Sequence, residues 1–249
     1  MRSQITGLTV RRCWLNEVII MENIESIMDA IEKYLDEKED LRERSIKACR
    51  NIIRHSRKAI QKMHKNENIE AANDLEKALA ELTEIHSLLK DRHNDLLYTG
   101  FMENAYRELS EGFCLLSILQ DENLPQPEDL NVTSSSYLLS LGDVVGELRR
   151  LTLDCIRNNR YDEAEEFFRK MEKIYISLLR FDYPSGMISI KKTQDNCRVL
   201  IEKTRGDLTV ALCNRKIEEK LSRLEKPLKE KTEEPKKEDV EDLNIDRVW

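Results

Sequence analysis

The stretch Tyr137–Leu151 reads YLLSLGDVVGELRRL and decides the fold class. Its apolar residues recur every three or four positions, which is the spacing of one face of an α-helix. They are Leu138, Leu141, Val145, Leu148 and Leu151. We therefore predict a packed helix over about 134–158, with Ser134, Ser135 or Ser136 as its N-terminal cap.

The same spacing recurs along most of the 249-residue chain. It predicts further helices over about 21–65, 69–98, 101–121, 161–180 and 188–221. The seam of the first runs through Ile46, Cys49, Ile53, Ser56, Ile60 and Met63. With only seven Gly and five Pro, the chain has too few turn formers for a β-sandwich or barrel. We expect an all-α fold.

The two ends differ from this patterned region. Residues 1–20 are expected to be a loose N-terminal extension or the product of a misplaced start codon, and 21–222 the helical domain. The segment 223–249 is rich in charged residues and is expected to be a disordered tail. No apolar run is long enough to cross a membrane. The six cysteines form no C-x-x-C pair, which favours reduced thiols and a cytoplasmic location.

Charge is unevenly distributed along the chain. The net charge is −7, which by itself argues against a nucleic-acid partner. Between Arg42 and Lys65, however, nine basic residues accompany a single acid, Glu43. A local field of this kind attracts an anionic partner, although a solvated helix face is the alternative interpretation.

Two acidic pairs occupy helix positions where structure alone does not require them. Glu108 and Glu111 are three residues apart, and Asp143 and Glu147 are four apart, so each pair shares a face. If the two helices pack side by side, four carboxylates converge, and such oxygen ligands suit Mg²⁺ or Mn²⁺. The alternative is ordinary surface acids, with Glu147 paired to Arg150.

The histidines give no comparable signal. His55, His64, His86 and His93 contain no H-E-x-x-H motif, and His86 with His93 lacks a third ligand. We expect them to be surface or packed side chains.

At these same residues the sequence resembles the translin family, and more closely its catalytic branch, the translin-associated factor X proteins of prokaryotic or archaeal type. The resemblance rests on four stretches and spans about Asn23 to Leu221. They are Arg107–Phe113, Tyr137–Leu151, Asp182–Pro184 and Glu202–Thr209.

The resemblance implies an Mg²⁺-dependent endoribonuclease. Glu111 and Glu147 would be the principal metal ligands, with Glu108 and Asp143 completing the site. A different alignment, anchored on Gly100, would use Glu103 but place Tyr106 at the second acid. A translin-type protein that binds RNA or DNA without cutting it is the alternative function.

The resemblance also implies a bundle of about seven helices that assembles into a hollow, octamer-like shell around nucleic acid. The partner would be single-stranded or short duplex RNA, with single-stranded DNA as a further option. Basic residues are expected to contact phosphates. They are Arg50, Arg54, Arg57 and Lys58 along the basic helix, and Arg107, Arg149 and Arg150 near the scissile phosphate.

Overall fold

The structure is a computed structural model that describes residues 6–232, with side chains described for 23–223. Within 6–232 every regular element is helical, which confirms the predicted all-α class. The elements are α1 (Thr6–Met63), α2 (Asn68–Leu89), the 3₁₀ turn η1 (Asn94–Tyr98), α3 (Gly100–Leu119), α4 (Ser134–Arg157), α5 (Tyr161–Leu178) and α6 (Ile190–Thr232).

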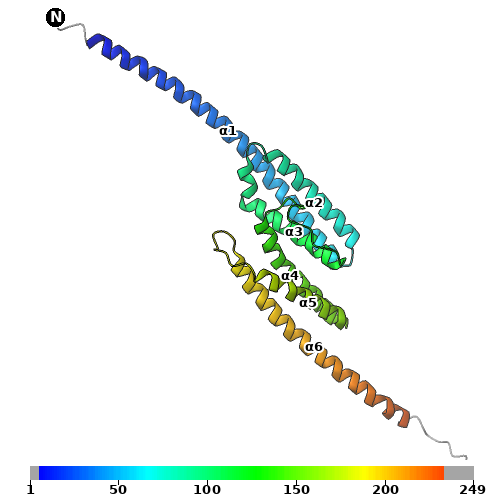
Figure 1. The fold of residues 1–249 in the computed structure, drawn as a ribbon. Helices are drawn as coiled ribbons and strands as arrows, with labels where there is room; N and C mark the ends of the chain where they lie inside the picture. The colour runs from blue at the N-terminus through cyan, green and yellow to red at the C-terminus, as the bar shows by residue number, and fades with distance from the viewer. Residues whose placement is uncertain (1–5, 233–249) are drawn as a thin grey trace, which may run out of the picture.

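The helices pack as two connected groups. One contains α1, α2 and α3, the other α4, α5 and α6, and α3 lies against α4 to join them. Figure 1 shows that α1 and α6 both run beyond the bundle, at opposite ends of an elongated molecule. The bundle lies between these two helical arms, and the junction of α3 with α4 lies near its middle.

The predicted seam of α1 is largely the buried face of that helix. Cys49, Ser56, Ile60 and Met63 are buried against α2 and α3, as expected. Ile46 and Ile53 lie at the edge of the face and are half-buried, while Ile52, which the sequence pattern left out, is fully buried. The seam is therefore rotated slightly, and Ile53 becomes available to line a surface cavity.

The predicted second helix is wrong at its C-terminal end. Instead of continuing from Ile69 to Tyr98, α2 stops at Leu89 and a turn over 90–93 leads into η1. Leu96 is nevertheless buried, so the apolar spacing continues although the helix has ended. The polar residues Asp91, Asn94 and Asp95 favour turns over helix, and this preference prevails.

The predicted serine cap of α4 is also wrong. Thr133 is the N-cap residue, because its hydroxyl oxygen accepts a 3.2 Å hydrogen bond from the backbone N–H of Ser136. At the outer ends, α1 begins at Thr6, well before the expected Met21, and α6 continues to Thr232 beyond the expected Leu221. The rest of the predicted disordered tail lies outside the described residues.

Glu103 connects the beginnings of α3 and α4. Its carboxylate accepts a 3.0 Å hydrogen bond from the Thr133 hydroxyl and another from the Ser136 hydroxyl. Ser136 also donates to the backbone carbonyl of Glu103 at 3.1 Å. This acid, the candidate in the Gly100-anchored alignment, therefore contacts the N-terminus of α4. We call this set of three residues the Glu103 clasp.

Two glycines one turn apart on α4 have different surroundings. A β-carbon at Gly142 would lie 2.1 Å from Cγ2 of Thr193 on α6, whereas one at Gly146 would meet no atom within 4 Å. Gly142 therefore permits the close approach of α6. Gly146 instead opens onto the cavity described below.

This difference predicts opposite effects of the same substitution. Gly142→Ala is expected to lower the free energy of unfolding by about 1–3 kcal/mol through overpacking. Gly146→Ala is expected to raise it by about 0.5–1 kcal/mol, because alanine favours the helix and meets no clash. Urea denaturation of both variants measures the two changes, and equal shifts would show that α4 and α6 do not pack closely at Gly142.

None of the helices within the described residues is both long enough and apolar enough to span a bilayer.

Candidate acidic site and basic groove

A cavity of about 610 Å³ lies where α1, α3, α4 and α6 meet. It contains all four acids that the sequence singled out, two from α3 and two from α4. The lining residues are Ile53, Arg57, Asn104, Arg107, Glu108, Glu111, Gly142, Asp143, Gly146, Glu147, Asn196 and Leu200. We call this cavity the acidic pocket.

Helix geometry explains why the acids meet. Glu108 and Glu111 continue the face of α3 that carries buried Leu115, so they point towards the neighbouring helix. Asp143 and Glu147 follow the two glycines of α4 and face the same space. Because α3 lies against α4, the two pairs border one cavity.

Three of the four acids are engaged by cationic or histidine side chains. Arg57 binds Glu108 through Nη2 at 2.5 Å and Nε at 3.0 Å. Arg107 binds Asp143 through Nε and through Nη2, the latter at 2.6 Å.

Glu147 forms a hydrogen bond with Nε2 of His64, a side chain that is only 5% exposed. Arg150 lies further from the same carboxylate, at 3.9 Å. The buried histidine therefore constrains the Glu147 carboxylate.

Glu111 differs from the other three, because no cation within the described residues pairs with it. Burial, together with the charges of Asp143, Glu108 and Glu147, raises the pKa of Glu111 to about 8, against an ordinary value of 4.5. Arg107 opposes the rise only in part. The pocket therefore holds more negative charge than its own arginines neutralise.

The raised pKa predicts a pH-dependent stability. Folding favours the protonated Glu111, so its stabilising contribution is complete below pH 4.5 and is lost as the pH rises through about 8. Glu111→Gln removes this loss, and we expect it to stabilise the metal-free protein by about 1–3 kcal/mol at about pH 9, after allowance for partial exposure to water. At about pH 5 the gain should be close to zero.

Thermal unfolding in a chelating buffer at both pH values measures this difference. Asp154→Asn, an acid on α4 outside the pocket, is the matched control and should show no such pH dependence. An equal effect of Glu111→Gln at both pH values would contradict the raised pKa.

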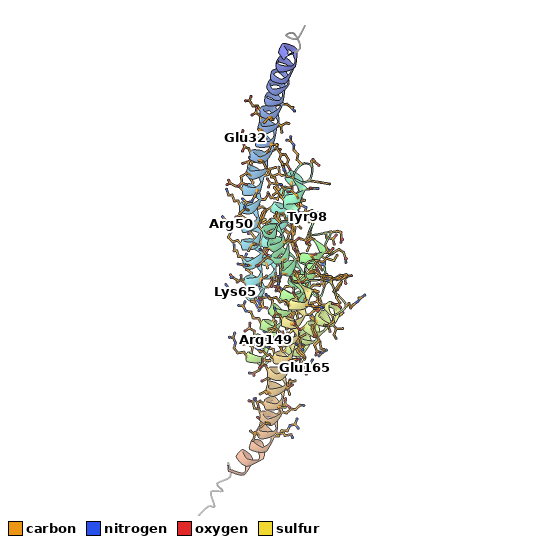
Figure 2. The ribbon with its side chains drawn as sticks, turned by 90° about the vertical axis from the view of Figure 1, so that its left-hand side faces the viewer. Glu32, Arg50, Lys65, Tyr98, Arg149 and Glu165 are labelled. Atoms are coloured by element: carbon orange, nitrogen blue, oxygen red, sulfur yellow. The ribbon has the colours of Figure 1, made fainter. Side chains whose placement is uncertain are left out.

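A second cavity, of about 490 Å³, adjoins the acidic pocket along α1. Its lining is Arg50, Ile53, Arg54, Arg57, Lys58 and Gln61, which includes all four basic residues predicted on this helix. We call it the basic groove. Ile53 and Arg57 line both cavities, so the groove leads directly into the pocket. Figure 2 shows Arg50 on α1 and Lys65 just after its end, both at the left-hand edge of the molecule.

The other predicted arginines are placed differently from one another. Arg107 lines the acidic pocket and Arg150 is mostly exposed beside it. Arg149 instead turns towards α6, where it donates to Thr204 at 2.6 Å and to Asp207 at 3.0 Å. It does not line either cavity.

Sequence reasoning missed three polar residues at this site. His64, in the turn that follows α1, is a packed side chain as expected, but its contact with Glu147 was not predicted. Asn104 and Asn196 line the pocket from α3 and α6. Each is a single polar residue with no local motif, so only the packing of the helices reveals its place.

The side chains of the pocket decide whether it suits a divalent cation. Among the side chains that the structure describes, no three His, Cys, Asp or Glu residues are grouped closely enough to hold a metal ion. Three of the four carboxylates are instead held by Arg57, Arg107 and His64. The donor set itself, four carboxylates with uncompensated charge at Glu111, fits a hard cation such as Mg²⁺.

The fold and site together define an all-α bundle protein with an acidic pocket that opens into a basic groove. A family model described as "Translin family" matches residues 40–206, a range that contains both cavities' lining residues. The chain belongs to the translin family, as its motifs indicated. The free arm of α1 and the last part of α6 lie outside the matched range.

Individual relatives agree with this assignment. An uncharacterized protein of Methanocaldococcus jannaschii is 30% identical over 209 residues, which cover 84% of this chain and 91% of that protein. The structure of a complex of AfC3PO with duplex RNA is similar with a TM-score of 0.68 and 30% identity, covering 76% of this chain and 97% of AfC3PO. Apo-NeC3PO, at 18% identity and a TM-score of 0.62, shares the fold.

Proposed function

We propose that this protein is a divalent-metal-dependent endoribonuclease that binds RNA along the basic groove and hydrolyses it at the acidic pocket. The observation that carries the proposal is the continuity of the two cavities through Ile53 and Arg57. A phosphodiester chain lying on the groove would bring one phosphate to the four carboxylates. The similarity to AfC3PO, solved with duplex RNA, supports RNA as the polymer.

The four acids would hold Mg²⁺ or Mn²⁺. Glu111 and Glu147 would be the principal ligands, while Glu108 and Asp143 would complete the coordination or orient water. When bound, such an ion supplies positive charge to the phosphate and makes water more acidic. Glu111 would give up its proton on binding, because the cation removes the charge crowding that raises its pKa.

The basic side chains would position the substrate. Arg50, Arg54 and Lys58 would contact successive phosphates without reading base sequence. Arg107 borders the pocket beside Asp143, where its guanidinium would hold the phosphate that is to be cleaved. His64 would hold the Glu147 carboxylate in place through its hydrogen bond.

A binding protein without nuclease activity is the second candidate. It is favoured by the ion pairs themselves, because Arg57 and Arg107 neutralise two of the acids without any metal. Such a protein would retain RNA in a salt-sensitive complex and form no products.

Incubation of purified protein with end-labelled RNA distinguishes the two functions. The nuclease should give products with Mg²⁺ or Mn²⁺ and none with a chelator. Stable binding with no cleavage under either metal would leave the binding function.

We also propose that the chain assembles with copies of itself, because the expected hollow shell around nucleic acid requires several copies. Apolar side chains on the arm of α1 are exposed in the single chain and follow one face of the helix at spacings of three and four. They are Ile24, Ile27, Met28, Ile31, Tyr34 and Leu35. Light scattering should find an oligomer, and Ile27→Glu with Ile31→Glu should reduce its size.

A further inference from the structure

Arg57 is the residue at which the two halves of the site meet. It lines both the acidic pocket and the basic groove, and its guanidinium pairs with Glu108 through hydrogen bonds from Nε and Nη2. We propose that Arg57 exchanges Glu108 for an RNA phosphate, and that this exchange makes RNA binding and divalent-cation binding at the pocket cooperative. The inference rests on the proposed function and adds a rule for its regulation.

The pair between Arg57 and Glu108 is well placed to be broken. The Arg57 side chain is 64% exposed, whereas Glu108 is 21% exposed. Water solvates the exposed guanidinium when the pair separates, so Arg57 itself loses little. Glu108 is left as a less exposed carboxylate without a partner, and a cation that binds it would offset that cost.

A phosphate offers Arg57 an equivalent partner. Guanidinium groups bind phosphate with the same two-pronged geometry that they use for carboxylates. Arg54 and Lys58 line the groove beside Arg57, so a backbone that they hold would present a phosphate within its reach. No other groove residue forms an ion pair with a pocket acid among the described side chains.

The exchange connects the two binding events. While Arg57 holds both oxygens of Glu108, that carboxylate is not a free ligand for a cation. RNA that takes Arg57 releases Glu108 for a cation, and a cation that takes Glu108 releases Arg57 for RNA. By thermodynamic reciprocity each ligand must then raise the affinity for the other by the same factor.

The test is a pair of calorimetric titrations on the full chain. Mn²⁺ is titrated alone and in the presence of a short 2′-O-methyl RNA whose integrity is checked afterwards. We expect RNA to raise the Mn²⁺ affinity by about 5- to 50-fold in the native chain.

Arg57→Ala should bind Mn²⁺ alone more tightly than the native chain, because Glu108 is already free, and should lose most of the RNA-dependent gain. Direct attraction between metal and phosphate would survive in this variant, so only the difference from the native chain reports the exchange. Arg57→Lys, which retains the charge without the two-pronged geometry, should retain part of the gain.

Arg54→Ala is the matched control, because Arg54 lines the groove but donates to Asn51 rather than to a pocket acid. It should weaken RNA binding and leave the ratio of Mn²⁺ affinities unchanged. An equal RNA-dependent gain in native and Arg57→Ala proteins would overturn the exchange while the nuclease proposal stands. Failure of Mn²⁺ to bind with or without RNA would overturn both.

Discussion

Glu147→Gln is expected to reduce RNA cleavage by about 100- to 1,000-fold, the usual loss when one charge-stabilising group is removed from a reaction centre. The amide retains the size of the side chain and its hydrogen bond with His64, but it lacks the negative charge that a divalent cation requires. RNA affinity should change little, because Glu147 lies outside the basic groove. Single-turnover cleavage and filter binding measure the two effects separately.

The matched control is Asp154→Asn, which removes an acid from the same helix outside the pocket. Its cleavage rate should equal that of the native chain. Glu111→Gln should resemble Glu147→Gln, and the double variant should lose little more than either, because residues that act as one unit are not additive. Undiminished cleavage in Glu147→Gln would show that the acidic pocket is not the reaction centre.

Arg50→Glu combined with Arg54→Glu is expected to weaken RNA binding by about 10- to 100-fold near 0.1 M salt. Both arginines line the basic groove and are exposed on α1, so the change replaces two phosphate contacts with two repulsions and leaves the helical core intact. The slope of log affinity against log salt should fall by about two, roughly one for each lost contact.

Lys191→Glu with Lys192→Glu tests whether position or charge alone matters. Both lysines are exposed at the start of α6 and lie outside the two cavities, yet the substitution changes the net charge by the same amount. RNA affinity should then be close to native. An equal loss in both double variants would indicate general attraction to a charged surface instead of a defined groove.

Periodicity predicted the helices well where burial is one-sided. In the predicted second helix the apolar residues at spacings of three and four form the face that α2 buries, because a helix against one neighbour needs one apolar stripe; they are Leu75, Ala78, Leu82, Ile85 and Leu89. The same rule failed at the break before η1, since buried Leu96 continued the spacing across a turn. Apolar spacing therefore indicates which side chains are buried, and it does not indicate whether one helix continues through them.

The candidate site, like the helices, was predictable only in part from the sequence. The spacing of Glu108 with Glu111, and of Asp143 with Glu147, predicted shared faces, and the packing of α3 on α4 brings both pairs to one pocket. The partners of these acids were not predictable. His64 and Arg57 reach them across more than fifty residues of sequence, so their contacts depend on tertiary packing.

The Glu103 clasp limits where residues can be inserted into, or deleted from, α3 and α4. The clasp joins the first turns of α3 and α4, and the pair of Arg107 with Asp143 meets further on, so both helices leave the clasp in the same direction. The clasp therefore fixes the positions of the acids on both helices. One residue inserted between the clasp and the acids of either helix would rotate those acids by about 100° around the helix axis. Insertions and deletions should therefore be tolerated in the loop 120–132 and in the two arms, and not between the clasp and the acids.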